Sequence, residues 1–222
     1  MARDSNDRIS TEELLHAYRL GYFPMARARD DEDIVWVLPD ERGVILLDDA
    51  CAPKRLQRTI KSEPFEIRIN TAFNEVILAC AENTPMRDET WINDQIIETY
   101  CELHSNGIAH SVECWRENQL VGGLYGVEIG GIFCGESMFS RETDASKVAM
   151  VHLIARLKAG GYRLIDAQFV NEHLYQFGLV GIPNEEYQIK LKQASLISTA
   201  PVFRSDFQLA TVRVLQSITQ TS

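Results

Sequence analysis

The sequence predicts an α+β protein, and three observations in its second half support this fold class. Residues 110–116 alternate apolar and polar side chains, and segments 120–129 and 132–139 follow after turn signals at 117–118 and 130–131, which is the pattern of a three-stranded antiparallel meander. An amphipathic helix is expected at 144–159, because apolar side chains recur there at helical spacing. A strand at 163–169 follows. A meander followed by a long helix and another strand is typical of an α+β fold.

The remaining elements follow from local signals. Ser10 and Glu13 have the spacing of a capping box, which predicts a helix that ends at Gly21. Other expected elements are strands at 44–47 and 65–69, helices at 72–82, 94–106, 171–177 and 184–195, and a basic segment at 54–61, and an acidic loop at 30–33 leads into an apolar segment at 34–37. This order predicts an acyltransferase-like α+β domain at 107–222 and a smaller mixed α/β domain at 1–106.

Composition excludes several classes of protein. The chain has 222 residues, of which 45% are hydrophobic and 24% charged, so disorder and collagen-like structure are excluded. No apolar run approaches the ~18 residues that cross a bilayer. The amino-terminal segment lacks the apolar core of a signal peptide, so we expect a cytoplasmic protein without a membrane partner. Five cysteines without a C-x-x-C pair are expected to be reduced thiols.

The charge balance is acidic. Lys and Arg number 22 and Asp and Glu 32, which gives a net charge of −10. A uniformly acidic surface repels nucleic acid, so an RNA partner would need a local basic patch. The overall balance suits a positively charged substrate better.

Two polar interruptions of apolar strands are the main candidates for a site. Glu136 carries a charge inside an apolar run, where a carboxylate is costly unless it is paired or functional. Strand alternation places Asp166 and Gln168 on one face, opposite Ile165, so that face borders either solvent or a site. The structural alternative for Glu136 is an ion pair at a strand end. Together the three polar residues would form an acidic pocket containing an amide, suited to a cationic amine.

Other features have both a functional and a structural interpretation. Trp91 precedes the helix cap at Asn93 and could stack on a base or fill a core, and Trp36 carries the same ambiguity. Lys54, Arg58 and Lys61 are spaced to share one helix face, which could follow phosphates or simply be solvated.

Several common catalytic patterns are absent or weak. No phosphate-binding loop and no G-x-S-x-G elbow occur in the sequence. Cys101 with His104, and His110 with Cys114, have spacings similar to those of zinc ligands. Core packing explains these side chains better, and no metal site is expected. His152 and His173 are isolated and are interpreted as structural.

Ordered motifs along the chain resemble one known family. The motifs are Leu14-Leu15-x-Ala17-Tyr18-x-x-Gly21-x-Phe23-Pro24, Thr90-Trp91-Ile92, Ala109-His110-Ser111-Val112-Glu113-x-Trp115, Leu120-Val121-Gly122-Gly123-Leu124-Tyr125-Gly126, Gly135-Glu136-Ser137-Met138-Phe139-Ser140 and Leu164-Ile165-Asp166-x-Gln168. They resemble the leucyl/phenylalanyl-tRNA–protein transferase family from residue 14 to about 190. The Gly135–Ser140 block together with Leu164–Gln168 is the most specific part.

The resemblance implies an enzyme with a carboxy-terminal acyltransferase domain of the GNAT type. Such enzymes move Leu, Phe or sometimes Met from aminoacyl-tRNA to an amino-terminal Arg or Lys of a protein, which creates a degradation signal read by the proteolytic machinery. No metal or cofactor is implied, because the charged tRNA is itself the activated donor. Residues 1–106 would contribute to binding the tRNA 3′ end. The protein is expected to be a monomer.

The resemblance also implies roles for particular residues. Gln168 would take a proton from the attacking α-amine or, as a weak base, position it, with Asp166 orienting the amine, and Glu136 with Asp166 would hold the cationic acceptor residue. Trp36 and Trp91 would flank the terminal adenosine. The donor pocket would be formed by Leu124, Phe133, Gly135, Met138, Leu153, Leu157 and Ile165. The tRNA would be held by Lys54, Arg55, Arg58 and Lys61.

The chain departs from the family pattern at a few positions, and two other functions remain open. Gln176-Phe177-Gly178 replaces a Ser-Leu-Gly element, Asn184 replaces an Arg, and Leu153 and Leu157 stand where the family often has aromatic residues. These departures leave the preference among Leu, Phe and Met open. The alternatives are a conventional acyl-CoA enzyme, which should need a Gly-rich loop that 140–146 lacks, and a non-catalytic adaptor that binds aminoacyl-tRNA or degrons.

Overall fold

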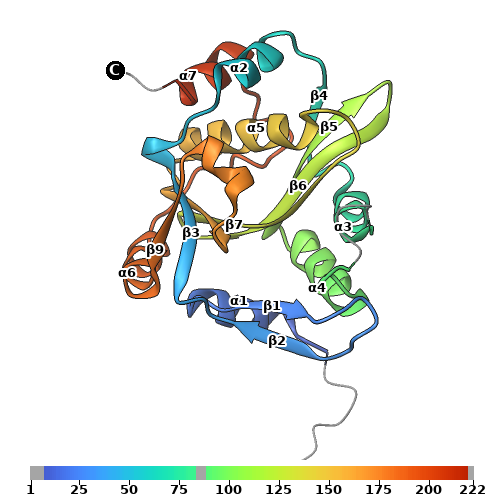
Figure 1. Ribbon diagram of the computed structural model, residues 1–222, viewed down its shortest axis with the longest axis vertical. Coiled ribbons are helices and arrows are strands. Elements are labelled where there is room, and N and C mark those ends of the chain that lie inside the picture. The colour runs from blue at the N-terminus through green and yellow to red at the C-terminus, as the bar shows by residue number, and fades with distance from the viewer. Residues whose placement is uncertain (1–7, 84–88, 220–222) are drawn as a thin grey trace, which may run out of the picture.

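A mixed seven-stranded sheet forms the centre of the molecule (Figure 1). The computed structural model describes residues 8–83 and 89–219. In spatial order the strands are β4 (Glu66–Ile69), β5 (Ala109–Arg116), β6 (Gln119–Ile129), β7 (Ile132–Ser140), β8 (Leu164–Gln168), β3 (Glu41–Leu46) and β9 (Leu179–Pro183). Neighbouring strands are antiparallel except β7 and β8, which are parallel. The predicted meander is therefore confirmed as β5–β6–β7.

Helices cover both faces of this sheet and enclose two hydrophobic cores. One face carries α5 (Ala145–Gly160), with α2 (Lys54–Lys61) and α7 (Thr211–Ser217) packed on it. The other face carries α3 (Phe73–Ala81) and α4 (Asp94–Ser105), with α1 (Thr11–Arg19) beside α4 (Figure 1). The remaining elements are a small sheet of β1 (Phe23–Ala26) and β2 (Ile34–Val37), the helix α6 (Asn184–Ala194), and 3₁₀ turns at Leu47–Asp49 and Glu172–Phe177.

The helix start signals in the sequence are confirmed at α1 and α4. The Ser10 hydroxyl accepts a hydrogen bond from the Glu13 N–H (3.2 Å), and the Glu13 carboxylate accepts one from the Ser10 N–H (3.0 Å). This reciprocal pair satisfies two of the amide groups that a helix leaves free at its start. At α4 the Asn93 side chain accepts a hydrogen bond from the Ile96 N–H (2.9 Å). Four short elements, β1, β2, β9 and α7, are not predicted from the sequence.

The central sheet takes strands from both sides of residue 107. β3 and β4 precede that position, and the other five strands follow it. β3 inserts between β8 and β9, so its two hydrogen-bonded neighbours come from the carboxy-terminal part of the chain. The division into 1–106 and 107–222 stays a prediction. None of the helices within the described residues has the length and apolar character needed to cross a membrane.

A tight crossing of backbones ends β8 at Gln168. The β3–β8 register shifts between Gly43 and Val44, and Gly43 faces Gln168. A Cβ atom at Gly43 would collide with the carbonyl oxygen of Phe169, so only glycine fits there. Gln168 itself has a left-handed backbone, with φ of 61°. The chain therefore leaves the extended conformation at Gln168, and the side chain of this residue no longer follows strand alternation.

Candidate active site

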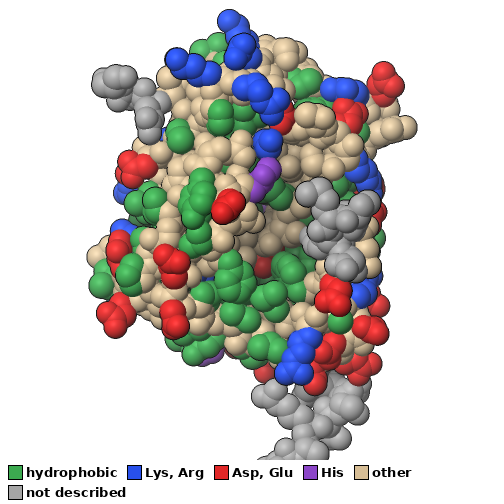
Figure 2. All heavy atoms as spheres, in the orientation of Figure 1, with side chains coloured by type: hydrophobic (Ala, Val, Ile, Leu, Met, Phe, Trp, Pro, Cys, Tyr) green, Lys and Arg blue, Asp and Glu red, His purple; other side chains and the backbone are tan. Residues whose placement is uncertain are grey.

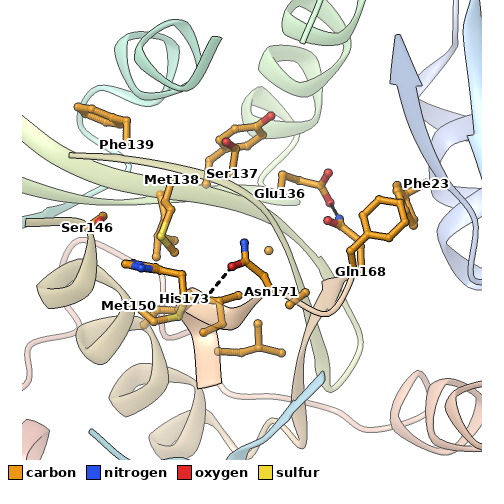
Figure 3. A pocket seen from close by; sticks show the side chains of 18 of the residues that line it. Phe23, Glu136, Ser137, Met138, Phe139, Ser146, Met150, Gln168, Asn171 and His173 are labelled. Carbon is orange, nitrogen blue, oxygen red and sulfur yellow. Dashed lines mark hydrogen bonds between the residues drawn. The ribbon is translucent and has the colours of Figure 1, made fainter. Parts of the chain in front are cut away.

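A cavity of about 480 Å³ lies where β7, the end of β8 and α5 meet. Its volume falls within the range of about 300–1,000 Å³ that is usual for small-molecule sites. The walls are mostly apolar, and Figure 2 shows the hollow with an acidic side chain inside it. At one side of the cavity lie Glu136, Gln168 and Phe23, and at the other lie Ser146, Met150 and His173 (Figure 3).

Glu136 is buried and is held by three side chains. Its Oε1 accepts hydrogen bonds from the Tyr18 hydroxyl (2.7 Å) and from the Gln168 amide nitrogen (2.8 Å). Its Oε2 lies 3.1 Å from the Tyr100 hydroxyl, and the two tyrosine hydroxyls contact each other. The tyrosines come from α1 and α4, so the helices on this face of the sheet fix the carboxylate of a β7 residue.

The Tyr18, Tyr100 and Glu136 contacts suit a protonated carboxyl group. Three short oxygen–oxygen contacts need three hydrogens, and two phenols supply only two. A protonated Glu136 supplies the third. Burial raises the pKa of Glu136 to about 7, an effect opposed by the tyrosine hydrogen bonds and increased by the charge of Asp166. The group therefore changes charge near neutral pH.

Asp166 does not line the cavity, which corrects the expectation that it contacts the acceptor amine. It is fully buried, and its carboxylate pairs with the Arg42 guanidinium through Nε (2.7 Å) and Nη2 (2.6 Å). The Tyr187 hydroxyl (2.7 Å) and the Gln168 backbone N–H (2.9 Å) also donate to it. With its oxygens satisfied in this way, Asp166 positions Gln168 through the backbone instead of facing a substrate.

The reason for this error is the backbone at Gln168. Strand alternation predicts that residues 166 and 168 share a face, but alternation holds only while the chain stays extended. The left-handed conformation of Gln168 turns its side chain into the cavity, while Asp166 stays on the side of Arg42 and Tyr187.

Comparisons with known proteins identify the family. Residues 44–192 match a family model described as leucyl/phenylalanyl-tRNA protein transferase, and residues 7–40 match a model of the amino-terminal domain of the same family. A leucyl/phenylalanyl-tRNA–protein transferase of Phenylobacterium zucineum is 56% identical over 186 residues, which is 84% of each chain. One of Maricaulis maris is 50% identical over 219 residues, covering 96% of this chain and 99% of that one. The chain belongs to the leucyl/phenylalanyl-tRNA–protein transferase family.

Solved structures give only weak matches. A functionally unknown conserved protein of Staphylococcus epidermidis has a TM-score of 0.40 and 13% identity, covering 80% of this chain and 66% of that one. L-PGS of Bacillus licheniformis has a TM-score of 0.38 and 12% identity, covering 83% and 63%. These scores establish no shared fold. The mixed α/β architecture is shown, whereas the GNAT-type fold expected from the sequence is not confirmed.

The structure brings most of the residues expected for this transferase family to one cavity. Besides Glu136 and Gln168, its lining includes Trp91, Leu124, Gly135, Met138, Leu153 and Ile165. Besides Asp166, three residues expected at the cavity lie elsewhere. Phe133 is buried and stacks on Phe203, with ring centroids 5.4 Å apart. Leu157 is buried in the core around α5, and Trp36 lies in β2 opposite Pro24.

The four basic residues expected to bind tRNA lie outside the cavity on α2. Lys54, Arg55, Arg58 and Lys61 are exposed, and α2 packs through Leu56 and Ile60. Lys and Arg side chains gather over this end of the molecule, above the hollow (Figure 2). The patch is therefore a local exception to the acidic balance of the whole chain.

Sequence reasoning missed several residues of this site. The sequence gives Tyr18 no role beyond its place in a family motif, and it singles out neither Tyr100 nor Arg42. An arginine beside a run of buried strand residues was the one available signal for Arg42, because a buried charge requires a partner. His173, which was interpreted as structural, lines the cavity with Asn171 (Figure 3). No three His, Cys, Asp or Glu side chains converge on a metal position within residues 8–83 and 89–219.

Proposed function

We propose that this chain transfers Leu, Phe or Met from aminoacyl-tRNA to an amino-terminal Arg or Lys of a protein, and so creates a degradation signal. Family membership supports the reaction class. The observation that supports the acceptor most strongly is Glu136. Among the described residues that line the cavity, it is the one acidic side chain, and it lies against Gln168.

Glu136 has the properties needed to select a cationic acceptor residue. Oε1 is occupied by two donors and Oε2 by one, so Oε2 retains an acceptor position. A guanidinium or ammonium group placed there would donate a hydrogen bond to Oε2 and stabilise the ionised carboxylate. A neutral acceptor side chain offers no charge for the carboxylate to pair with, so its binding beside a protonated Glu136 gains nothing from this interaction.

Gln168 is suited to align the attacking amine. Its Nε2 donates to Glu136, so its Oε1 is directed away from the carboxylate and can accept a hydrogen bond from the α-amine. An α-amine has a pKa of roughly 7.7–8.0, so a useful fraction is neutral without a strong base. The nitrogen then forms a bond to the ester carbonyl carbon, the bond to the ribose oxygen breaks, and the amine proton passes to that oxygen. Alignment of the reacting groups supplies much of the rate in such a reaction.

The rest of the cavity is suited to an apolar donor side chain. Leu124, Leu153 and Ile165 contribute apolar walls, and Met138 and Met150 contribute flexible thioethers. Flexible side chains let one pocket accept Leu, Phe and Met. Trp91 lines the same cavity and can stack on the terminal adenosine. The same role for Trp36 stays a prediction.

In this proposal the two parts of the chain have different functions, tRNA binding and positioning of the acceptor. Residues 1–106 supply Trp91 and the basic face of α2, which would bind the tRNA and its 3′ end. Residues 107–222 supply Glu136 and Gln168. A monomeric state and a cytoplasmic location stay predictions.

Transfer of radiolabelled Leu, Phe and Met from charged tRNA to peptides beginning with Arg, Lys or Ala tests the proposal. We expect transfer to Arg and Lys peptides and not to Ala peptides. Binding of the tRNA without transfer to any peptide would instead support the adaptor, and protection of the protein by coenzyme A would support an acyl-CoA enzyme.

A further inference from the structure

Asp144 occupies an unusual place at the start of α5. It has a left-handed backbone, with φ of 65°, and stands at the position where an aspartate usually caps the helix. Its side chain makes no such cap. Oδ1 instead accepts hydrogen bonds from Arg55 Nη2 (2.7 Å) and Lys147 Nζ (3.1 Å). One carboxylate therefore joins a cation of α2 to a cation of α5.

The three side chains are layered by exposure. Asp144 is only 5% exposed, whereas Lys147 is 23% and Arg55 63% exposed. The Asp144 carboxylate therefore lies beneath the surface, and the two cationic groups lie between it and the solvent. Arg55, Lys147 and Asp144 together carry one net positive charge, and the Lys54, Arg58 and Lys61 side chains of α2 extend this basic surface. The arrangement fixes two flexible cationic side chains and leaves a net positive charge.

Arg55 and Lys147 do not line the cavity themselves, but a direct neighbour of Lys147 does. Ser146, between Asp144 and Lys147 in the sequence, lines the cavity on the side away from Glu136 (Figure 3). His173 lines the same side, and burial together with the charge of Lys147 lowers its pKa. When the aminoacyl group of a charged tRNA fills the cavity, the RNA strand must extend out of the cavity past one of its walls. The wall beside Lys147 leads to the basic face of α2.

We propose that Arg55 and Lys147 bind phosphate groups of the tRNA 3′ end next to the cavity, and that Asp144 is the positioning residue that holds them there. The inference rests on the proposed function and adds Lys147 and Asp144 to it. Phosphate is favoured as the ligand because two fixed cationic donors on an otherwise acidic protein suit a dianionic or polyanionic backbone. The protein would then guide the single-stranded end from α2 into the cavity.

Comparing two aminoacyl substrates distinguishes an effect on phosphate binding from an effect on the reaction itself. Aminoacyl-tRNA carries the phosphates, and 3′-O-aminoacyl-adenosine carries the same reactive ester without them. For Lys147→Met we expect the KM for aminoacyl-tRNA to rise about tenfold, with kcat and the kinetics of the nucleoside donor unchanged. The dependence of log KM on log salt should become shallower by about 0.7, the value for one phosphate contact on a single strand. Lys190→Met on α6 is the matched control and should leave KM and kcat unchanged for both substrates.

Asp144→Asn tests the positioning role, since asparagine tolerates a left-handed backbone and keeps an acceptor oxygen but loses the charge. We expect the KM for aminoacyl-tRNA to rise about threefold, and no further rise from this substitution in Arg55→Met/Lys147→Met. Equal effects on both donors, or no effect on either in Lys147→Met, would overturn the proposal. Failure of the unmodified enzyme to use charged tRNA at all would instead refute the proposed function.

Discussion

Replacing Glu136 by glutamine should remove a loss of stability that the wild-type protein undergoes as the pH rises from 5 to 8. Burial holds the pKa of Glu136 at about 7 in the folded protein, against 4.5 for an exposed glutamate. A folded pKa above the unfolded value means that stability is fully present below about pH 4.5 and is lost as the pH rises through about 7. Linkage over this interval amounts to about 2.5 kcal/mol between pH 5 and pH 8. Glutamine does not ionise, so the unfolding free energy of Glu136→Gln should not fall in this way as the pH rises.

Urea unfolding at pH 5 and pH 8 measures the effect. The difference in unfolding free energy, Glu136→Gln minus wild type, should become more positive by about 2.5 kcal/mol from pH 5 to pH 8. Lost hydrogen bonds to Tyr18 and Tyr100 shift the variant at both pH values and cancel in this comparison. Glu75→Gln, on the exposed side of α3, is the control and should follow the wild type within about 0.5 kcal/mol. A difference that does not change with pH would refute the coupling of burial to ionisation at Glu136.

Three further substitutions test other parts of the structure. Arg42→Met leaves the Asp166 carboxylate buried and unpaired, so it should cost about 3–5 kcal/mol in urea unfolding, and Asp166→Asn in the same chain should restore part of it; a loss below about 1 kcal/mol would contradict this. Leu153→Phe fills the cavity, and in competitive transfer assays the ratio of Phe to Leu use should fall about tenfold; an unchanged ratio would place the donor side chain elsewhere. Arg58→Glu should raise the KM for aminoacyl-tRNA and flatten its salt dependence, and an unchanged slope would remove α2 from the tRNA path.

Glu136 could be found from the sequence because it breaks a strong local pattern, and Gln168 because it is a polar residue in an apolar strand. A charge inside an apolar strand is visible without any structure, since its burial is costly. The meander, α5 and the cap of α1 were equally local, and all three were predicted correctly. Local signals thus located the cavity and its two principal polar groups.

Partners that lie far apart in the sequence could not be found in this way. Tyr18 and Glu136 are 118 residues apart, and Arg42 and Asp166 are 124 apart. No periodicity connects such positions, because the sheet order that joins them depends on β3 entering between β8 and β9. Alternation places Asp166 on the face of Gln168, but one left-handed residue at the end of β8 is enough to invalidate that rule.

The insertion of β3 between two late strands also determines when the enzyme can be completed during synthesis. The backbone groups of residues 41–46 find their partners only when residues 164–183 are available, so the centre of the sheet closes after most of the chain has been made. Long-range pairings of this kind slow folding, and an unpaired strand exposed meanwhile is prone to aggregation. Arg42 on that strand has no ion-pair partner until Asp166 has been synthesised. The cavity is therefore a late product of folding, and a nascent chain that stops before β8 has no site at all.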